Sequence, residues 1–365
     1  MKETLIIAEA GVNHNGSLEL ALQLVDAAKA AGADIIKFQA FIADNLVTQN
    51  ADQAQYQQNN IGKKQTQLEM LKELELSFDS HQIIKNYCEE QGIEYLSTAF
   101  DMESLNFLTH DMQLNRFKIP SGEITNAPFI LAHACTGKEL IVSTGMSDLV
   151  EVKLALAVIA FGLLNSIGQY LDKEPNEDNF YKAFNSVQGQ KQLKEKVTLL
   201  HCTTDYPARP TDINLLALKT MEEAFSLRVG YSDHSEGISV PIAAVARGAC
   251  IIEKHFTLNK LLPGPDHKAS LSPVELNDMV KSIRLVEQSI GNGIKQATPA
   301  ELNNKKVIRK SLVAGKNISK GECFTKENLV IKRPGTGLSP LLYWEMLNHV
   351  SKVDYQVGDL IKEHD

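Results

Sequence analysis

The run TLIIAEAGVNH, residues 4–14, is short and apolar and ends in polar and ionisable residues. Further runs of this kind follow along the chain: DIIKFQAF (34–41), IEYLSTAF (93–100), RFKIPSGE (116–123), LIVSTG (140–145), VTLLHCTTDY (197–206), RVGYSDH (228–234) and CIIEKHFT (250–257). Helix-like sequence separates most of them. This series is typical of a (β/α)8 TIM barrel, in which the C-terminal strand ends and the βα loops build the active site. The ends of the runs therefore supply the candidate functional residues.

The connecting segments complete this pattern. Apolar residues at helical spacing predict helices within 17–33, 68–74, 78–92 and 272–291, with Ser17 and Ser272 as N-caps. Residues 43–65 are rich in Gln, Asn and Ala and predict a long loop. The polar, helix-prone segment 165–196 predicts a solvated surface insertion between two strands.

The residue pattern of the sequence changes near Thr298. Short apolar segments alternate with GK, KG and PGTG turns, which predicts a small β-rich module. A barrel of about 250 residues leaves room for one such extra domain. We therefore expect two domains, a barrel over residues 1–295 and a β-rich domain over 296–365.

Composition narrows the class of protein. A net charge of −8 and a pI near 5.7 provide no general basic field, so we expect neither nucleic-acid nor anionic-membrane binding. The five cysteines lie far apart without a CxxC pair, which argues against a zinc site or a disulfide framework. The apolar run before Glu9 is too short for a signal peptide, and no later stretch is expected to approach a membrane span. We expect a cytoplasmic protein.

Two histidines, His234 and His255, end strands that are neighbours in the predicted barrel. Neutral imidazoles are common ligands of divalent transition metals, so the pair predicts a Lewis-acid metal site with positions left for water and substrate. The alternative is that they are hydrogen-bonded core residues.

Lysines, hydroxyls and carboxylates gather at the other run ends. Lys37 and Lys118 each need an anionic partner, either a protein carboxylate or a bound phosphate. The hydroxyls there can donate to phosphate oxygens, and the carboxylates can act as acids or bases. The hydroxyls belong to Ser97, Thr98, Ser121, Ser143, Thr144, Thr203, Thr204 and Ser232, and the carboxylates to Glu9, Glu123, Asp233, Glu253 and Asp266. The residues thus predict a metal-assisted enzyme for a phosphate-bearing, hydroxyl-rich substrate.

The motifs AEAGVNHNG, IKFQ, STAFD, FKIPSGE, STGM, HCTTDYP, GYSDH, EKHFT, GPDH and KRPGTG resemble the sialic acid synthases from end to end. The resemblance implies condensation of phosphoenolpyruvate with an open-chain N-acetylmannosamine-type sugar. The metal would polarise the aldehyde, C3 of phosphoenolpyruvate would attack it, and water would add at C2 before C–O cleavage releases phosphate. It also implies that residues 296–365 form an antifreeze-like (SAF) domain, which crosses a homodimer to cap the partner's barrel.

Carried over by position, the resemblance implies a role for each matching residue. Glu9, Lys37 and Lys118 would be catalytic, with Glu9 positioning or deprotonating the water. His234 and His255 would hold the metal, most simply Mn²⁺, with Mg²⁺ or Co²⁺ as alternatives. Phosphoenolpyruvate would contact Lys37, Thr98, Lys118, Ser121, Ser143, Thr204 and Ser232, and the sugar would contact Glu9, Gln39, Glu123, Tyr206, Asp266 and Arg333.

Two departures bear on the sugar. The chain has IPSGEITN and Thr204 where N-acetylneuraminate-forming members have GSGECNN and Asn, which leaves the phosphate contact of Thr204 open. With QLEMLKELELS at 67–77, these features resemble the branch that makes N,N'-diacetyllegionaminic acid from a 2,4-diacetamido-6-deoxy sugar. The alternatives are N-acetylneuraminate and pseudaminic acid synthases, a lysine Schiff-base aldolase, and a sugar-binding protein without activity.

Overall fold

The computed structural model describes residues 3–61 and 65–362. The chain divides into two compact units, Met1–Gly291 and Asn292–Asp365. The expected domain boundary at 295/296 lies in the connection between α13 (Pro273–Ile290) and α14 (Pro299–Ile308). Each unit has its own hydrophobic core.

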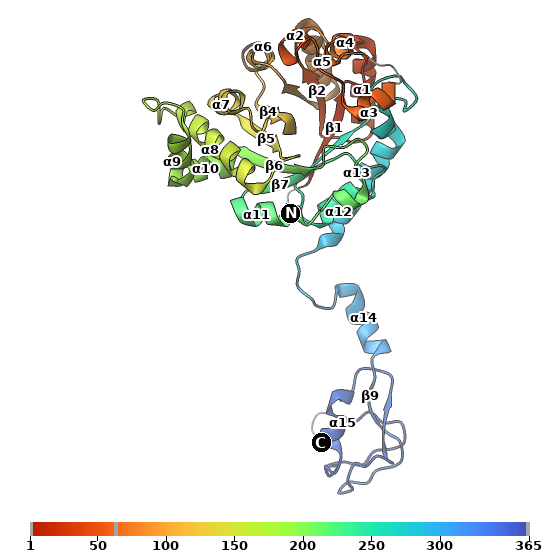
Figure 1. Cartoon of the computed structure of the whole chain (residues 1–365). Coiled ribbons are helices and arrows are strands. Elements are labelled where there is room, and N and C mark those ends of the chain that lie inside the picture. The colour runs from red at the N-terminus through yellow and green to blue at the C-terminus, as the bar shows by residue number, and fades with distance from the viewer. Residues whose placement is uncertain (1–2, 62–64, 363–365) are drawn as a thin grey trace. The chain divides into compact units, whose positions relative to one another are not determined.

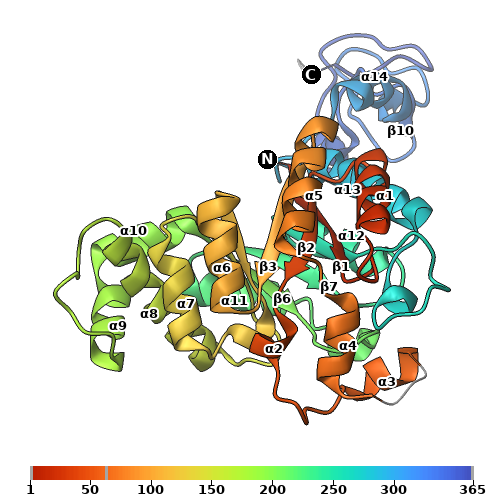
Figure 2. The same cartoon turned by 90° about the horizontal axis from the view of Figure 1, so that it is seen from above.

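The first unit is a closed barrel of parallel strands in sequence order, as predicted from the run pattern (Figures 1 and 2). Its strands are β1 (Leu5–Gly11), β2 (Ile35–Ala40), β3 (Glu94–Ala99), β4 (Arg116–Ile119), β5 (Glu139–Ser143), β6 (Val197–Cys202), β7 (Arg228–Asp233) and β8 (Ile251–His255). Side chains alternate across each strand, so residues two apart share a face. An apolar cluster therefore fills the barrel interior one layer below the polar strand ends: Ile7, Ile35, Leu96, Ile141, Leu200 and Ile251.

The predicted helices form with the expected caps. In α1 (Leu18–Ala30) the Ser17 side chain accepts from the Leu20 N–H, and Ser272 with Glu275 makes a capping box on α13. The helices α4 (Gln67–Leu74) and α5 (Phe78–Gln91) match the predicted ranges. The loop prediction for 43–65 was wrong in part, because α2 (Ala43–Leu46) and α3 (Gln55–Ile61) form there, while residues 62–64 lie outside the described residues.

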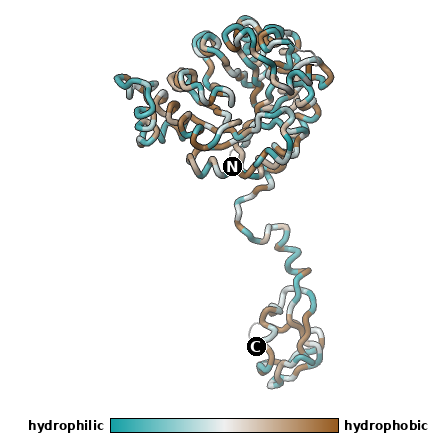
Figure 3. The backbone as a smooth tube through the Cα atoms, in the orientation of Figure 1, coloured by the Kyte–Doolittle hydropathy of each residue, from teal (hydrophilic) through white to brown (hydrophobic). Residues whose placement is uncertain are grey.

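The insertion 165–196 forms α9 (Glu177–Asn185) and α10 (Val187–Lys196), and it is not merely a solvated surface. Phe180, Ala183 and Leu193 are buried against α8 (Leu149–Ser166), which α7 (Ala127–Cys135) covers from another side. The buried residues of α8 are continuous from Ala155 to Leu164 and so occupy every face of the helix. Figure 3 colours the backbone by the hydropathy of each residue. The expectation that no stretch approaches a membrane span was wrong for α8 by length and composition, yet 61% of that helix is buried within the protein.

The remaining helices of the first unit connect the strands. They are α6 (Met102–Asn106), η1 (Phe107–Asp111), η2 (Ser121–Glu123), η3 (Pro210–Asp212), α11 (Ala217–Phe225), α12 (Ser239–Ala246) and η4 (His267–Ala269).

The second unit is less β-rich than expected. Besides α14 it contains an antiparallel pair, β9 (Ser311–Ala314) with β10 (Leu329–Lys332), and the short helices η5 (Pro340–Leu342) and α15 (Tyr343–Met346). Isolated bridges such as Ile318 with Tyr355 hold the loops. Its core includes Leu312, Phe324 and Ile361.

Candidate active site

A cavity of about 250 Å³ opens at the C-terminal ends of the barrel strands. Its lining brings together nearly all of the residues singled out in the sequence: Glu9, Lys37, Gln39, Thr98, Lys118, Ser121, Ser143, Thr204, Tyr206, Ser232, His234, His255 and Asp266. Strand register explains the gathering, because Glu9 pairs with Lys37 on one side and His255 on the other, and Ser232 pairs with Glu253.

Glu253 is the centre of a buried ionic layer on the cavity floor. Its Oε2 lies 2.9 Å from Lys37 Nζ, and its Oε1 lies 3.1 Å from Lys118 Nζ. Ser232 donates to the same Oε1 at 2.8 Å. Burial alone would raise the pKa of Glu253, but the positive charges of Lys118 and Lys37 outweigh it and lower that pKa, so Glu253 stays ionised. The lysines are thus partnered by a protein carboxylate while still lining the cavity.

Glu9 completes this layer in a different electrostatic state. Its Oε2 lies 3.2 Å from Lys37 Nζ, and Gln39 donates to its Oε1 at 3.3 Å. Burial, opposed by the Lys37 charge, raises the pKa of Glu9 to about 7, and the negative charge of Glu253 acts in the same direction as burial. A carboxyl group with a pKa near neutrality can accept or release a proton under ordinary conditions.

The imidazoles of His234 and His255 face each other, with ring centroids 5.6 Å apart. His234 Nδ1 lies 2.7 Å from the Thr203 carbonyl oxygen, which can only accept, so Nδ1 carries the proton and Nε2 keeps its lone pair. Buried His255 Nδ1 has no hydrogen-bond partner among the described residues. Burial lowers the pKa of both rings and so favours the neutral, ligating form.

This donor set fits a divalent metal held by two protein ligands. Asp266 Oδ2 lies 3.9 Å from His255 Nδ1, which is too far for a hydrogen bond. Within the described ranges, no group of three or more His, Cys, Asp and Glu side chains gathers as a metal cluster. A metal held by the imidazoles keeps positions for substrate oxygens, as a catalytic site requires.

Hydroxyl groups surround the cavity next to the lysines. Ser121 Oγ accepts from the Gly145 N–H at 3.0 Å, and Ser143 Oγ is buried with no partner in the described part of the chain. A Cβ at Gly145 would lie 2.4 Å from Thr204 Oγ1, so only glycine lets the backbone approach these groups so closely. The arrangement offers donors to an anion bound above Lys37 and Lys118.

Part of the cavity lining is an apolar wall, which the strand-end pattern does not predict. Met70, Leu71 and Leu74 on α4 line it together with Val12 and Phe100. The α3 side chain of Gln57 also reaches the cavity. Asn60 of the same helix donates to the Pro265 carbonyl at 2.6 Å and fastens α3 beside the mouth.

Two residues that the family resemblance places at the sugar, Glu123 and Arg333, do not line the cavity. Among the other candidate hydroxyls and carboxylates, Ser97, Thr144, Thr203 and Asp233 do not line it either. Glu123 lies in η2 and accepts from Asn126 at 2.7 Å instead. Arg333 belongs to the second unit, where it is exposed and its Nε donates to the Ile308 carbonyl. Conversely, Glu253 was noted only as one of several carboxylates, although alternation from His255 in IIEKH could have placed it inside the barrel.

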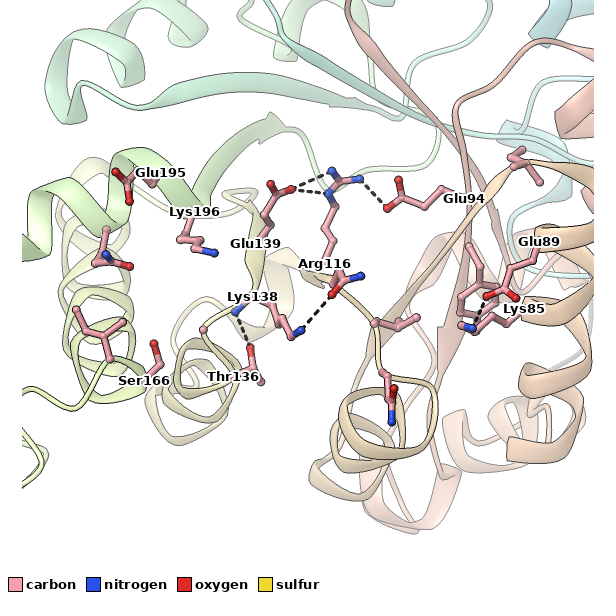
Figure 4. A pocket seen from close by; sticks show the side chains of 18 residues that line it. Lys85, Glu89, Glu94, Arg116, Thr136, Lys138, Glu139, Ser166, Glu195 and Lys196 are labelled. Atoms are coloured by element: carbon pink, nitrogen blue, oxygen red, sulfur yellow. Dashed lines mark hydrogen bonds and ion pairs between the residues drawn. The ribbon is translucent and has the colours of Figure 1, made fainter.

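A larger hollow of about 980 Å³ lies at the other end of the barrel, where the strands begin. Its most prominent cation, Arg116, is held by Glu94 at 2.7 Å and Glu139 at 2.9 Å (Figure 4). Lys138 donates to Asn115 at 3.1 Å. These polar groups are paired with one another, and TIM-barrel active sites lie at the opposite face, so we assign no catalytic role to this hollow.

Comparison with known proteins agrees with this geometry. The NeuB family model matches residues 24–295. The chain is 44% identical to an N,N'-diacetyllegionaminic acid synthase of Campylobacter jejuni over 100% of both chains. It is 46% identical to one of Legionella pneumophila over 92% of this chain and 86% of the relative. A solved N-acetylneuraminic acid synthetase of Leptospira borgpetersenii superposes with a TM-score of 0.66 at 30% identity, over 83% of this chain and 90% of the other. The chain therefore belongs to the NeuB family, and it is a synthase of the sialic and legionaminic acid type.

Proposed function

We propose that this protein condenses phosphoenolpyruvate with open-chain 2,4-diacetamido-2,4,6-trideoxymannose to give N,N'-diacetyllegionaminic acid and phosphate. The observation that carries the proposal is the cavity itself, which joins a cationic, hydroxyl-lined floor and a histidine pair to an apolar wall. The two relatives of 44% and 46% identity support the same choice of sugar.

The floor suits phosphoenolpyruvate, whose carboxylate and phosphate need several cationic and neutral donors. Lys37 and Lys118 supply fixed positive charge, and Ser121, Ser143 and Ser232 supply hydroxyls around them. Because Glu253 already orients both ammonium groups in the free protein, little reorganisation is needed when the anion binds. Thr98 Oγ1 accepts from Lys37 Nζ at 3.4 Å and further limits its movement. Thr204 lies close enough to Gly145 to contribute to the same anion site.

Glu9 is the residue we assign to the water that adds at C2. Attack of C3 of phosphoenolpyruvate on the sugar aldehyde forms the carbon–carbon bond and leaves C2 electron-poor. Water then adds at C2, gives up a proton, and the C2–O bond to phosphate breaks. A carboxylate with a pKa of about 7 can take that proton at neutral pH, and neighbouring Lys37 stabilises the charged form.

His234 and His255 would hold the divalent metal, for which we favour Mn²⁺ over Mg²⁺ or Co²⁺, since imidazole suits transition metals better than Mg²⁺. A bound divalent ion supplies Lewis-acid polarisation of a carbonyl oxygen. Tyr206 stacks near His234, with ring centroids 4.2 Å apart, and helps to keep that imidazole in place.

The apolar wall is the reason for preferring a 6-deoxy sugar. A methyl group placed against Met70, Leu71 and Leu74 leaves water favourably, at about 0.8 kcal/mol per buried CH₂. The hydroxyl of N-acetylmannosamine in the same place would lose its hydrogen bonds to water, which costs about 1–3 kcal/mol. Gln39 and Asp266 provide polar contacts for the remaining sugar hydroxyls and amides.

We further propose a homodimer in which Arg333 of the second unit reaches the partner's sugar site, as the family resemblance implies. Leu341 and Trp344, exposed and close together in the sequence of that unit, offer apolar side chains for such a contact. No disulfide links the cysteines in the described part of the chain, which suits a reducing cytoplasm.

Phosphate release with three sugars tests the proposal. Metal-reconstituted protein would be given N-acetylmannosamine, its 6-deoxy analogue or 2,4-diacetamido-2,4,6-trideoxymannose, and chelated protein serves as control. We expect no release without metal and a kcat/KM that rises about 10–200-fold from the first sugar to the third. Preference for N-acetylmannosamine would instead identify an N-acetylneuraminate synthase. Release with none of the three sugars, but with the pseudaminate precursor supplied as a fourth, would identify a pseudaminic acid synthase.

A further inference from the structure

A buried ion pair lies directly behind the two histidines and has no role in the chemistry proposed above. Lys254 Nζ lies 2.6 Å from Asp233 Oδ2, and each of the two residues is 1% exposed. The pair faces away from the cavity, because alternation along β8 puts Glu253 and His255 inside the barrel and Lys254 outside.

The pair connects the two strands that carry the histidines. Asp233 and Lys254 are directly opposed in the β7–β8 register, and each stands one residue before a histidine. Lys254 Nζ also contacts the carbonyl oxygen of Ser235, so it holds the residues on both sides of His234. One ammonium group on β8 thereby determines where the β7 loop, and its imidazole, can lie.

Further hydrogen bonds make this arrangement rigid. The hydroxyl of Tyr231 and the N–H of Ser235 both donate to Asp233 Oδ1, at 3.1 and 2.9 Å. The carboxylate therefore uses both oxygens, and the side chain has one orientation. A buried ion pair generally contributes little net stability, whereas the partners at both ends of this one restrict it to a single geometry.

We propose that the Asp233–Lys254 pair is a positioning device that holds His234 at the separation from His255 needed to bind a divalent metal. This inference rests on the proposed function for its metal site. Groups that orient metal ligands typically change metal affinity 10–100-fold when removed.

A purely electrostatic role and a positioning role of Lys254 predict opposite changes in metal affinity for Lys254→Met. Removal of a positive charge beside a divalent cation strengthens binding if charge alone matters. Loss of the Lys254 contacts with Asp233 and Ser235, on both sides of His234, weakens metal binding, because the imidazole must then be ordered when the metal binds. We expect the Co²⁺ dissociation constant to increase 10–100-fold, with a changed visible absorption spectrum of the bound Co²⁺.

Arg116→Met is the matched control. Arg116 likewise joins neighbouring strands through carboxylates, with Glu94 on β3 and Glu139 on β5, but at the opposite end of the barrel (Figure 4). We expect it to lower the melting temperature and leave Co²⁺ affinity and spectrum as in the unmodified protein. A parallel loss of affinity in Arg116→Met would attribute the effect to general destabilisation and overturn the proposal.

If the single variant Lys254→Met does not fold, the double variant Asp233→Asn with Lys254→Met replaces it in the test, because it leaves no unpaired charge buried. The proposal predicts weakened Co²⁺ binding here too. Unchanged or tighter binding in either folded variant would overturn it. If the unmodified protein binds no Co²⁺, the metal site itself fails and the proposed function with it. Lack of turnover with the chosen sugar while Co²⁺ still binds overturns the substrate assignment alone.

Discussion

Replacing Glu253 by glutamine should destabilise the barrel by about 3–5 kcal/mol, because it removes the negative charge that the buried ammonium groups pair with. Glu253 lies 2.9 Å from Lys37 Nζ and 3.1 Å from Lys118 Nζ, and an ion pair at this separation is worth about 5 kcal/mol at an effective dielectric constant near 20. Lys37 keeps Glu9 at 3.2 Å, whereas Lys118 has no other ion-pair partner among the described residues. The unpaired Lys118 ammonium therefore accounts for most of the cost.

The assay is thermal unfolding followed by circular dichroism at pH 7. At roughly 2 °C per kcal/mol for a unit of this size, the melting temperature should fall by roughly 6–10 °C. The matched control is Glu139→Gln, since the Glu139 side chain is 45% exposed and such a pair contributes at most about 1 kcal/mol. Adding Lys118→Met to Glu253→Gln should recover most of the loss, because no ammonium then remains unpaired. Equal melting temperatures for Glu253→Gln and Glu139→Gln would refute the reasoning.

The same variant has a defined pH dependence. Burial lowers the pKa of Lys118 below its ordinary value of 10.5, and Glu253 opposes that shift. Without Glu253 the folded-state pKa falls further, so between that pKa and 10.5 the unfolded state binds more protons than the folded state. Stability then increases with pH across this window, and the destabilisation should shrink as pH rises toward 10.5.

Three further predictions concern turnover. Glu9→Gln should fold and bind phosphoenolpyruvate by calorimetry while kcat falls about 10²–10⁴-fold, and near-normal turnover would remove Glu9 from the chemistry. The acid limb of kcat/KM should follow the Glu9 pKa of about 7, with activity lost as pH falls below it. Gln39→Leu removes a donor that lowers this pKa, so the limb should move to higher pH; an unmoved limb would assign it to another group. Leu71→Asn places an amide in the apolar wall and should reduce the preference for 6-deoxy-N-acetylmannosamine over N-acetylmannosamine about tenfold, and an unchanged ratio would show that the wall does not contact C6.

Much of the site was accessible from the sequence because a parallel barrel has a simple rule. Polar residues at strand ends converge on one face, and residues two apart on a strand point the same way. His234 and His255, and the two lysines Lys37 and Lys118, are placed by that rule alone, and the structure brings all of them to one cavity. The rule does not extend past a strand end, which is why Glu123, in the turn of η2, was expected at the cavity but does not line it.

Which charged side chains form ion pairs was decided only by closure of the barrel. Lys118 and Glu253 are 135 residues apart, and no local pattern indicates that they meet at 3.1 Å. The raised pKa of Glu9 likewise depends on how deeply the closed barrel buries it and on where Lys37 and Glu253 stand around it.

The sequence by itself determined the order of strands and helices, the face on which the chemistry lies and the residue types available to it, because these follow from periodicity along a continuous chain. The tertiary structure decided the distances: those in the ionic layer around Glu253, those from Lys254 to the residues on both sides of His234, and those that place the apolar wall of α4 at the cavity. Those contacts join segments far apart in the chain, and their energies depend on separations and burial that only the packed barrel sets.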